Sequence, residues 1–94
     1  RSAAQCIIHF LLETGDRLAQ VAGEDGPASK VDLPISQEQL GSILAITPVH
    51  ISRVLKDLQS EGLLASKDGA WVFPDRHAAE SFCEYHARQL DLDD

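Results

Sequence analysis

One face of a predicted helix at residues 48–61 gathers side chains that suit contact with the edges of nucleic-acid bases. Its members recur at three- and four-residue steps, as neighbours on a helix do: Val49, Ser52, Arg53, Lys56 and Ser60. The guanidinium fork of Arg53 can donate two hydrogen bonds to guanine, Ser52 can bond a base or a phosphate, and Val49 can touch a thymine methyl group. We therefore predict these three as base contacts. The alternative is a solvated helix face, on which Arg53 lies near Asp57 one turn away.

Six further residues are predicted to contact the phosphate backbone or the base edges beside it: Ser36, Gln37, Thr47, His50, Lys56 and Lys67. Three of them stand at predicted helix starts, where free backbone N–H groups favour phosphate binding. The two lysines supply positive charges for the backbone, and the histidine can donate to a phosphate or a base. A surface position without a binding role explains each of these residues taken alone, so the prediction depends on their joint arrangement.

Capping residues divide this region into two helices. Ser36 followed by Gln39 has the capping-box pattern of a helix start. Thr47 is the N-cap candidate of the second helix, and Pro48 suits its first position because proline lacks the N–H that a helix start leaves unpaired. The apolar residues expected to face the core are Leu40, Ile43 and Leu44 in the first helix and Ile51, Val54, Leu55 and Leu58 in the second. A helix-turn-helix is therefore predicted over 36–62.

Further elements are predicted on both sides of the helix-turn-helix. An opening helix covers 1–23, with Gly15 as a weak point by propensity. A short extended piece follows at 31–33. Two apolar runs around an Asp-Gly pair predict a β-hairpin, the wing, over 63–73. An aspartate can then cap a C-terminal helix over 75–90.

This order of elements defines the predicted fold class, which is mainly α with a small β-hairpin wing: a winged helix-turn-helix. Residues 1–94 are enough for one domain with one core. In this arrangement the second helix buries one face and leaves the other free to enter a major groove. Double-stranded DNA is therefore the predicted partner.

A net charge of −7 is unusual for a DNA-binding chain, where a basic surface is expected. Acidic residues are concentrated outside the predicted interface: residues 36–76 hold four basic and five acidic side chains, whereas 77–94 hold one and five. Such a weakly charged face predicts that duplex binding needs two copies of the domain or a partner. The alternative function is a winged-helix module that binds proteins without binding DNA.

Two Cys-x-x-His pairs are candidates for a metal site. Cys6 with His9 and Cys83 with His86 could hold a tetrahedral zinc ion if the first and last helices met. Coincidence in two amphipathic helices explains the pairs better, because no loop framework accompanies them, so we predict no metal and no cofactor in this chain. A glycine-rich phosphate loop, a nucleophile elbow and a carboxylate dyad are all lacking, which predicts that the chain is not an enzyme.

Three stretches closely resemble the C-terminal domain of Crp/Fnr-family transcription regulators: L-P-I-S-Q-E-Q-L at 33–40, L-A-I-T-P-V-H-I-S-R-V-L at 44–55, and Leu58 with E-G-L at 61–63. That family commonly has a leucine-proline lead-in, a T-P-V-H type of recognition-helix start and an L-x-x-E-G-L segment before the wing. The resemblance extends from about residue 3 to residue 73. Ala45 departs from it, because the family usually has glycine at this turn position.

The resemblance implies a homodimeric regulator that binds a palindromic promoter site, with Val49, Ser52 and Arg53 facing the bases. It also implies RNA polymerase as a partner, and an effector-sensing β-barrel and a dimerisation helix ahead of Arg1. The effector cannot be inferred from these residues. The chain begins at Arg1 and contains no Met, so we interpret it as a fragment. No apolar run is long enough to span a membrane and no signal peptide is recognisable, which predicts a cytoplasmic location.

Overall fold

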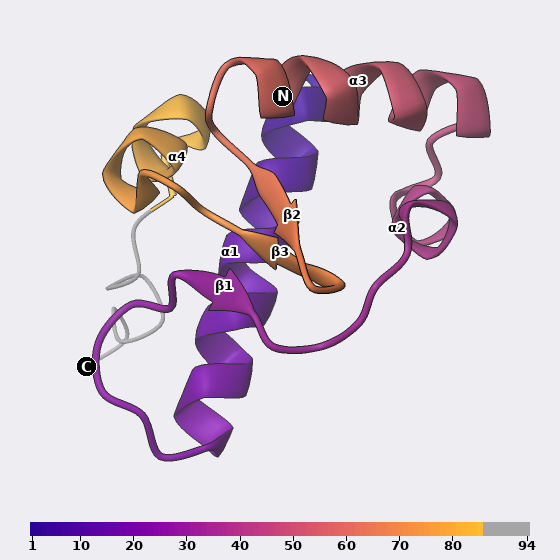
Figure 1. Ribbon diagram of the computed structural model, residues 1–94. Coiled ribbons are helices and arrows are strands. Elements are labelled where there is room, and N and C mark those ends of the chain that lie inside the picture. Colours follow the sequence, from indigo (N-terminus) through magenta and orange to yellow (C-terminus); the bar gives the residue numbers. More distant parts are fainter. Residues whose placement is uncertain (86–94) are drawn as a thin grey trace.

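Helices and short strands alternate along residues 1–85, the part of the chain that the computed structural model describes. Its helices are α1 (Ala3–Val21), α2 (Gln37–Leu44), α3 (Pro48–Ser60) and α4 (Arg76–Cys83), and its strands are β1 (Lys30–Val31), β2 (Ala65–Lys67) and β3 (Ala70–Val72). Figure 1 shows α1 passing behind the sheet and α3, with α4 beside it. This arrangement confirms the predicted winged helix-turn-helix. None of the helices within 1–85 combines the length and apolar character that a membrane crossing requires.

Helix α1 supplies the layer on which the other elements pack. A capping box starts it: the Gln5 N–H donates to Ser2 Oγ over 3.1 Å, and the Ser2 N–H donates to Gln5 Oε1 over 3.0 Å. Its apolar stripe is fully buried and consists of Ile7, Ile8, Leu11 and Leu12. The buried faces of β1, α3 and α4 lie against α1. Burial of this stripe therefore holds the helices and the sheet in one core.

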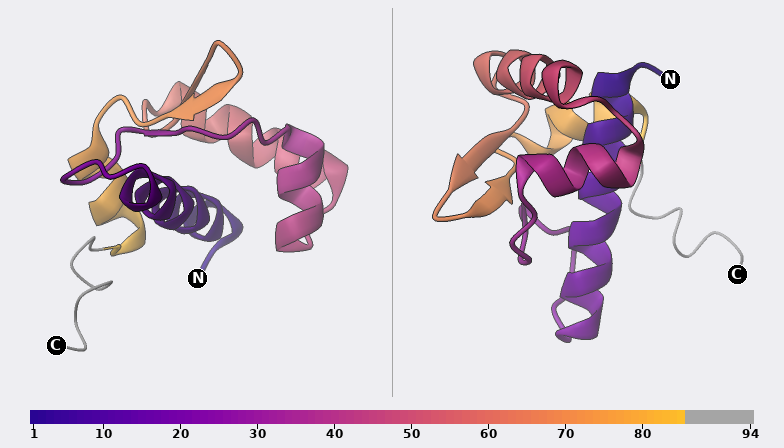
Figure 2. Two further views of the ribbon diagram at one scale, coloured as in Figure 1. Left: turned by 90° about the horizontal axis from the view of Figure 1, so that it is seen from below. Right: turned by 90° about the vertical axis from the view of Figure 1, so that its right-hand side faces the viewer.

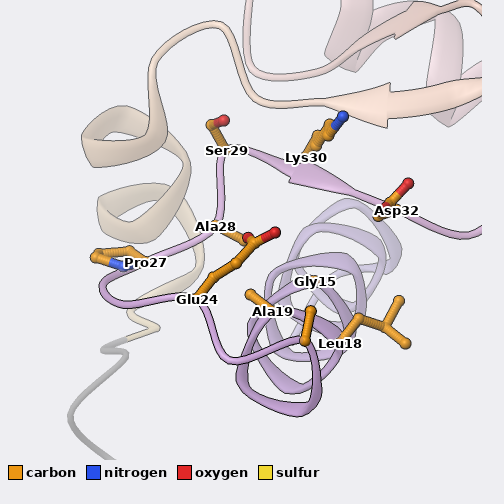
Figure 3. A pocket seen from close by; sticks show the side chains of 10 residues that line it. Gly15, Leu18, Ala19, Glu24, Pro27, Ala28, Ser29, Lys30 and Asp32 are labelled. Carbon is orange, nitrogen blue, oxygen red and sulfur yellow. The ribbon is translucent and has the colours of Figure 1, made fainter.

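Gly15, which propensity alone marks as a weak point of α1, gives strand β1 room to cross the helix. A Cβ atom at this position would lie 2.9 Å from the carbonyl oxygen of Lys30, too close for any real side chain. Figure 3 shows this crossing, with Gly15 below the segment that ends in Lys30 and Asp32. The hollow beside the crossing measures about 240 Å³, which is below the roughly 300–1,000 Å³ of common ligand sites.

The wing is part of a three-stranded antiparallel sheet in the order β1-β3-β2, so the predicted two-stranded hairpin is incomplete. The hairpin turn itself agrees with its sequence signal, because Asp68 and Gly69 have positive φ angles of 53° and 82°. Strand β1 places Lys30 opposite Val72 and Val31 opposite Trp71, so the extended piece predicted at 31–33 joins the sheet through its first residue, Val31. Strands β1 and β3 are far apart in the sequence, so their pairing leaves no local pattern there. The sequence therefore does not predict that β1 is the third strand of the sheet.

Trp71 joins the sheet to the helix-turn-helix. Its ring is 7% exposed on the inner face of β3. The ring N–H donates to the carbonyl oxygen of Ile35 over 2.8 Å. Because Ile35 directly precedes the N-cap of α2, this bond fixes the start of the helix-turn-helix relative to the wing.

Helix α4 is shorter than the predicted 75–90. It begins as expected, with the Ala78 N–H donating to the side chain of Asp75 over 3.1 Å. It ends at Cys83, because Glu84 adopts a left-handed conformation with φ 58° that closes the last turn. The predicted continuation beyond residue 85 lies outside the described residues.

A buried carboxylate joins α1 to α4 and to the loop between α1 and β1. Asp16 is 4% exposed and accepts hydrogen bonds from Arg76 at 2.7 and 2.9 Å. It also accepts from the Tyr85 hydroxyl at 2.9 Å and from the Ala28 N–H at 2.9 Å. The same arginine donates to the Ala28 carbonyl oxygen over 2.6 Å and to Glu80 over 2.8 Å. We call these residues the Asp16 network; the sequence shows Asp16 only as a polar residue off the apolar stripe.

In the Asp16 network, hydrogen bonds keep Asp16 ionised although burial favours its neutral form. Burial favours the neutral carboxyl, but the bonds from Arg76, Ala28 and Tyr85 outweigh it and lower the pKa of Asp16 below its usual value. Burial and the neighbouring carboxylate raise the pKa of Tyr85 well above its ordinary range. The bonds to Asp16 and Glu80 raise the pKa of Arg76 despite its burial. At neutral pH the network therefore holds an ion pair and a protonated tyrosine.

Removal of the carboxylate by Asp16→Ala is expected to lower the free energy of unfolding by about 3–5 kcal/mol. Arg76 then keeps only Glu80 as an ion-pair partner, and the buried Tyr85 hydroxyl and the Ala28 N–H lose their acceptor. Glu13→Ala is the matched control, since it also removes a carboxylate that pairs with an arginine on α1. The Arg17–Glu13 pair is more exposed, so this loss should be about 0.5 kcal/mol or less. Urea unfolding followed by circular dichroism measures both values. Equal losses of unfolding free energy would show that the Asp16 network contributes no more to stability than an exposed ion pair.

Acid is expected to destabilise the domain through the same carboxylate. Because the pKa of Asp16 is depressed on folding, its contribution is complete above the unfolded-state pKa of about 3.9 and is lost as the pH falls through the folded-state pKa. Asp16→Asn cannot titrate, so its free energy of unfolding should fall less steeply than that of the wild type below about pH 5. Urea titrations over a pH series measure the two slopes. Parallel slopes would show that other carboxyl groups cause the acid sensitivity.

Candidate nucleic-acid interface

The two helices of the interface start at the residues that the sequence predicts. At α2, the Gln39 N–H donates to Ser36 Oγ over 3.0 Å and the Ser36 N–H donates to Gln39 Oε1 over 2.9 Å, a complete capping box. At α3, the His50 N–H donates to Thr47 Oγ1 over 3.3 Å, and Pro48 is the first helical residue. These caps fix where each helix begins and hence which side chains share a face.

A tight turn at Ala45 sets the angle between α2 and α3. Ala45 is left-handed, with φ 58° and ψ 42°. The Ile46 N–H donates to the Gly41 carbonyl oxygen over 2.8 Å, which closes the turn. A Cβ atom on Gly41 would lie 3.0 Å from the Ile46 carbonyl oxygen and 3.4 Å from the side chain of Ile51. A small residue at 41 therefore allows the second helix to lie directly against the first.

The predicted apolar faces of α2 and α3 need correction at three residues. Ile51, Leu55 and Leu58 are buried as expected, but Leu44 and Val54 are only half-buried. The sequence predicts Ile43 on the buried face of α2, yet its side chain is 56% exposed. It borders a groove of about 710 Å³ with Phe10 of α1 and Leu33. With only eight residues, α2 is too short for its spacing pattern alone to separate a buried from a half-exposed position.

All of the predicted contact residues are exposed in the structure: Val49, Ser52, Arg53, Ser36, Gln37, Thr47, His50, Lys56 and Lys67. Helix α3 presents Val49, Ser52, Arg53 and Lys56 on one side, opposite its buried face. Val49 is 71% exposed, so this polar surface includes an accessible methyl pair. The residues thus form one surface at the outer side of α3, with further contributions from the starts of α2 and α3 and from the hairpin.

The cap bonds narrow the set of backbone groups that can hold a phosphate. Both the N–H of Ser36 and that of Gln39 are used in the capping box. The N–H groups at Gln37 and Glu38 are the ones that α2 leaves at its start. At α3, Thr47 Oγ1 accepts from His50, and the Val49 N–H is left because Pro48 has none. The prediction for Ser36 and Thr47 therefore depends on their hydroxyl groups, and that for Gln37 on its backbone.

Among the residues that the structure describes, no carboxylate forms an ion pair with Arg53. Within residues 1–85, the ion pairs closer than 4.0 Å join Arg17 to Glu13, and Arg76 to Asp16 and Glu80. The alternative partner of Arg53, Asp57, is absent from these pairs. The guanidinium is therefore free to donate to a ligand, as a base contact requires.

One lysine near this surface, Lys30, is not among the contact residues predicted from the sequence. Lys30 of β1 and Lys67 of β2 line the same hollow, although they are far apart in the sequence. The available signal was the alternation at 30–32, which places a buried valine between two charged residues, as in a half-buried strand. The strand that Lys30 pairs with could not be inferred from that pattern.

The Cys-x-x-His pairs do not form a metal cluster within residues 1–85. Helices α1 and α4 do meet, and Gln5 Nε2 donates to the Phe82 carbonyl oxygen over 3.1 Å. Cys83 is buried, its Sγ donates to the Ala79 carbonyl oxygen, and burial raises the pKa of its thiol. The fourth residue of the set, His86, lies outside the described residues.

The family assignment rests on a match that covers most of this architecture. The family of Crp-like helix-turn-helix domains matches residues 5–80, from the first turn of α1 into α4. The chain belongs to this family. The match confirms the resemblance found in the sequence, and the matched residues include α2, the Ala45 turn and α3. No curated protein matches the sequence significantly.

Solved structures share the fold of this Crp-like domain. A transcriptional regulator of the CRP family from Thermus thermophilus superposes with a TM-score of 0.66 at 21% identity, over 89% of this chain and 41% of that one. CprK, solved in its oxidized form with o-chlorophenolacetic acid, gives a TM-score of 0.63 at 20% identity, over 85% of this chain and 32% of its own. At these identities the likeness establishes the fold. The Crp-like domain spans less than half the length of either protein.

Replacing the left-handed residue of the turn by Ala45→Gly is expected to stabilise the Crp-like domain by about 1 kcal/mol, because glycine adopts this conformation without the steric cost of a Cβ atom. Ala22→Gly is the control. Ala22 caps α1 with an ordinary right-handed φ of −79°, so glycine there gains nothing and should destabilise by several tenths of a kcal/mol. Urea unfolding of both variants should give shifts of opposite sign, and shifts of the same sign would contradict strain at Ala45.

Proposed function

We propose that this Crp-like domain binds double-stranded DNA in a sequence-specific manner and acts in transcription regulation, with α3 in the major groove. The main support is the free guanidinium of Arg53 on the exposed side of α3, within a fold shared with CRP-family regulators. Buried residues on the other side of α3 pack against α1 and α2. This packing holds the reading surface, the exposed side of α3 with Val49, Ser52 and Arg53, in a fixed position. The regulatory role follows from the family, and the geometry supports the DNA contact.

Each predicted contact has a distinct task in this proposal. Arg53 donates a bidentate pair to guanine, Ser52 bonds a base or phosphate, and Val49 packs on a thymine methyl group. The hydroxyl groups and free N–H groups at the helix starts, together with His50 and the lysines, position the domain on the backbone. Base contacts supply the sequence preference, and backbone contacts supply most of the affinity.

A dimer would explain how an acidic domain binds DNA. The net charge of −7 gives one copy no long-range attraction for a duplex. Two copies on a palindromic site double the contacts and raise the effective concentration of the second domain. We propose that the full-length protein is such a homodimer, with an effector-sensing domain that controls binding and with RNA polymerase as a further partner. The greater length of the two structural relatives supports the presence of another domain.

A protein-binding module is the second candidate function. Net acidity favours it, as does the groove whose borders include the exposed side chains of Leu33 and Ile43. The salt dependence of binding separates the two functions. A protein that neutralises DNA phosphates releases counterions, so the logarithm of its affinity falls linearly with the logarithm of the salt concentration. An affinity for duplex DNA that is absent or independent of salt would favour the protein-binding module.

Arg53→Ala is expected to lower the affinity for DNA and to relax the preference at one base pair of each half-site, a discrimination of about 1–3 kcal/mol. Selection of binding sequences from a random duplex pool measures the preference, and fluorescence anisotropy measures the affinity.

Two control variants separate the effect of the planar guanidinium group of Arg53 from the effect of its positive charge. Arg53→Lys keeps the charge but not the planar fork, so it should lose the base preference while retaining most of the salt dependence. Arg17→Ala removes an equal charge from α1 and should leave the preference intact. If Arg53→Ala selects the same sequences as the wild type, the assignment of Arg53 as a base contact is incorrect.

A further inference from the structure

The register of the sheet places two lysines on one face. Lys30 lies directly opposite Val72, and Lys67 lies directly opposite Ala70. Directly paired residues share a face of a sheet, as do residues two apart on one strand. Because Val72 and Ala70 are two apart on β3, both lysines project from the same, outer face. Trp71, which lies between those two residues, is buried on the inner face.

The two lysines border one shallow site. They line a hollow of about 410 Å³, together with Ser29, Asp32 and Asp68. Figure 3 shows the Lys30 side chain directed away from α1 and toward the ribbon of the wing. Strand β1 therefore brings the ammonium group of Lys30 to the surface on which the hairpin carries Lys67.

Both ammonium groups are available to a ligand. Although two carboxylates border the hollow, the ion pairs closer than 4.0 Å in residues 1–85 involve arginines alone. The equal number of lysines and aspartates gives the hollow no net charge. Its lysines can therefore act at contact distance but cannot attract an anion from far away.

The hollow lies on the same side of the molecule as the reading surface of α3. Helix α3 and strand β1 both pack their buried residues on α1. Figures 1 and 2 show α1 behind α3 and the wing in one view and to one side of both in the other. The sides of α3 and of the sheet that do not pack on α1 therefore turn away from it. A duplex bound along α3 would thus run past the outer face of the sheet.

We propose that Lys30 binds a phosphodiester group of this duplex next to the one that Lys67 binds, so that the third strand of the sheet adds a backbone contact to those of the hairpin. The proposal rests on DNA binding by α3. Two ammonium groups on a rigid sheet suit adjacent phosphates of one strand, and the serine hydroxyl at 29 can donate to the same oxygens. Asp32 opposes the contact by repelling the phosphate, which limits the affinity of a single domain.

Salt titrations test the contact without knowledge of the preferred sequence. The probe is a mixed-sequence DNA duplex, titrated with the chain of residues 1–94 between about 50 and 200 mM salt. Lys30→Ala should make the slope of log affinity against log salt shallower by about 0.9, so that its affinity falls about threefold less over this range than that of the wild type. Lys67→Ala should have the same effect, and the double variant should show the sum of both. Asp32→Asn should raise the affinity.

Arg17→Ala is the matched control, because it removes one exposed positive charge from α1. A slope for Lys30→Ala equal to that of the wild type or of Arg17→Ala would overturn the proposal. Thermal unfolding should confirm that each variant is folded, which is expected because the lysine side chains are exposed. If the wild type shows no salt-dependent binding even at protein concentrations of about 1 mM, above the usual range of non-specific dissociation constants, the proposed function fails as well. If Lys67→Ala and Arg53→Ala change binding and Lys30→Ala does not, only the present inference fails.

Discussion

The carboxylate of Asp16 holds the elements around the helix-turn-helix in position relative to one another. It accepts hydrogen bonds from the backbone just ahead of β1, from the first residue of α4 just after β3, and from Tyr85 beyond α4. The ends of two neighbouring strands are thereby fixed to one point on α1. A domain of this size has a small core, so one charged group with four hydrogen bonds contributes a large share of its order. The position of the wing relative to α3 follows from this anchor and from the bond between Trp71 and Ile35.

Local signals in the sequence were sufficient to predict the helix-turn-helix. Both N-caps, the proline at the start of α3 and the Asp-Gly turn of the hairpin occur as predicted, because each depends on residues at most three positions apart. Features that depend on distant residues were missed. Neither the pairing of β1 with β3 nor the partners of Asp16 can be inferred from spacing, and Gly15 has its role only because β1 crosses α1 there. The exposure of Ile43 was missed for a related reason, since eight residues contain too few turns to define a buried face.

Charge and shape make different contributions to the candidate interface. The net charge is too negative to attract DNA over a distance, and the hollow between the lysines is neutral. The domain offers a rigid helix whose Arg53 has no ion-pair partner within residues 1–85, with single positive charges around it. Such a surface can distinguish base sequences at contact, but it attracts DNA only weakly from a distance. The number of copies bound to one duplex therefore becomes the main determinant of affinity.

The capping box at Ser2 has a mechanical consequence. Ser2 is extended, with φ −77° and ψ 164°, and its side chain and N–H are both engaged in starting α1. A helix joined ahead of Arg1 cannot continue into α1 without breaking these bonds, because a helical Ser2 would direct its hydroxyl away from the Gln5 N–H. With this cap intact, a preceding segment cannot form one continuous helix with α1. The direction of α1 is therefore set by its packing within the domain and not by the direction of what comes before it.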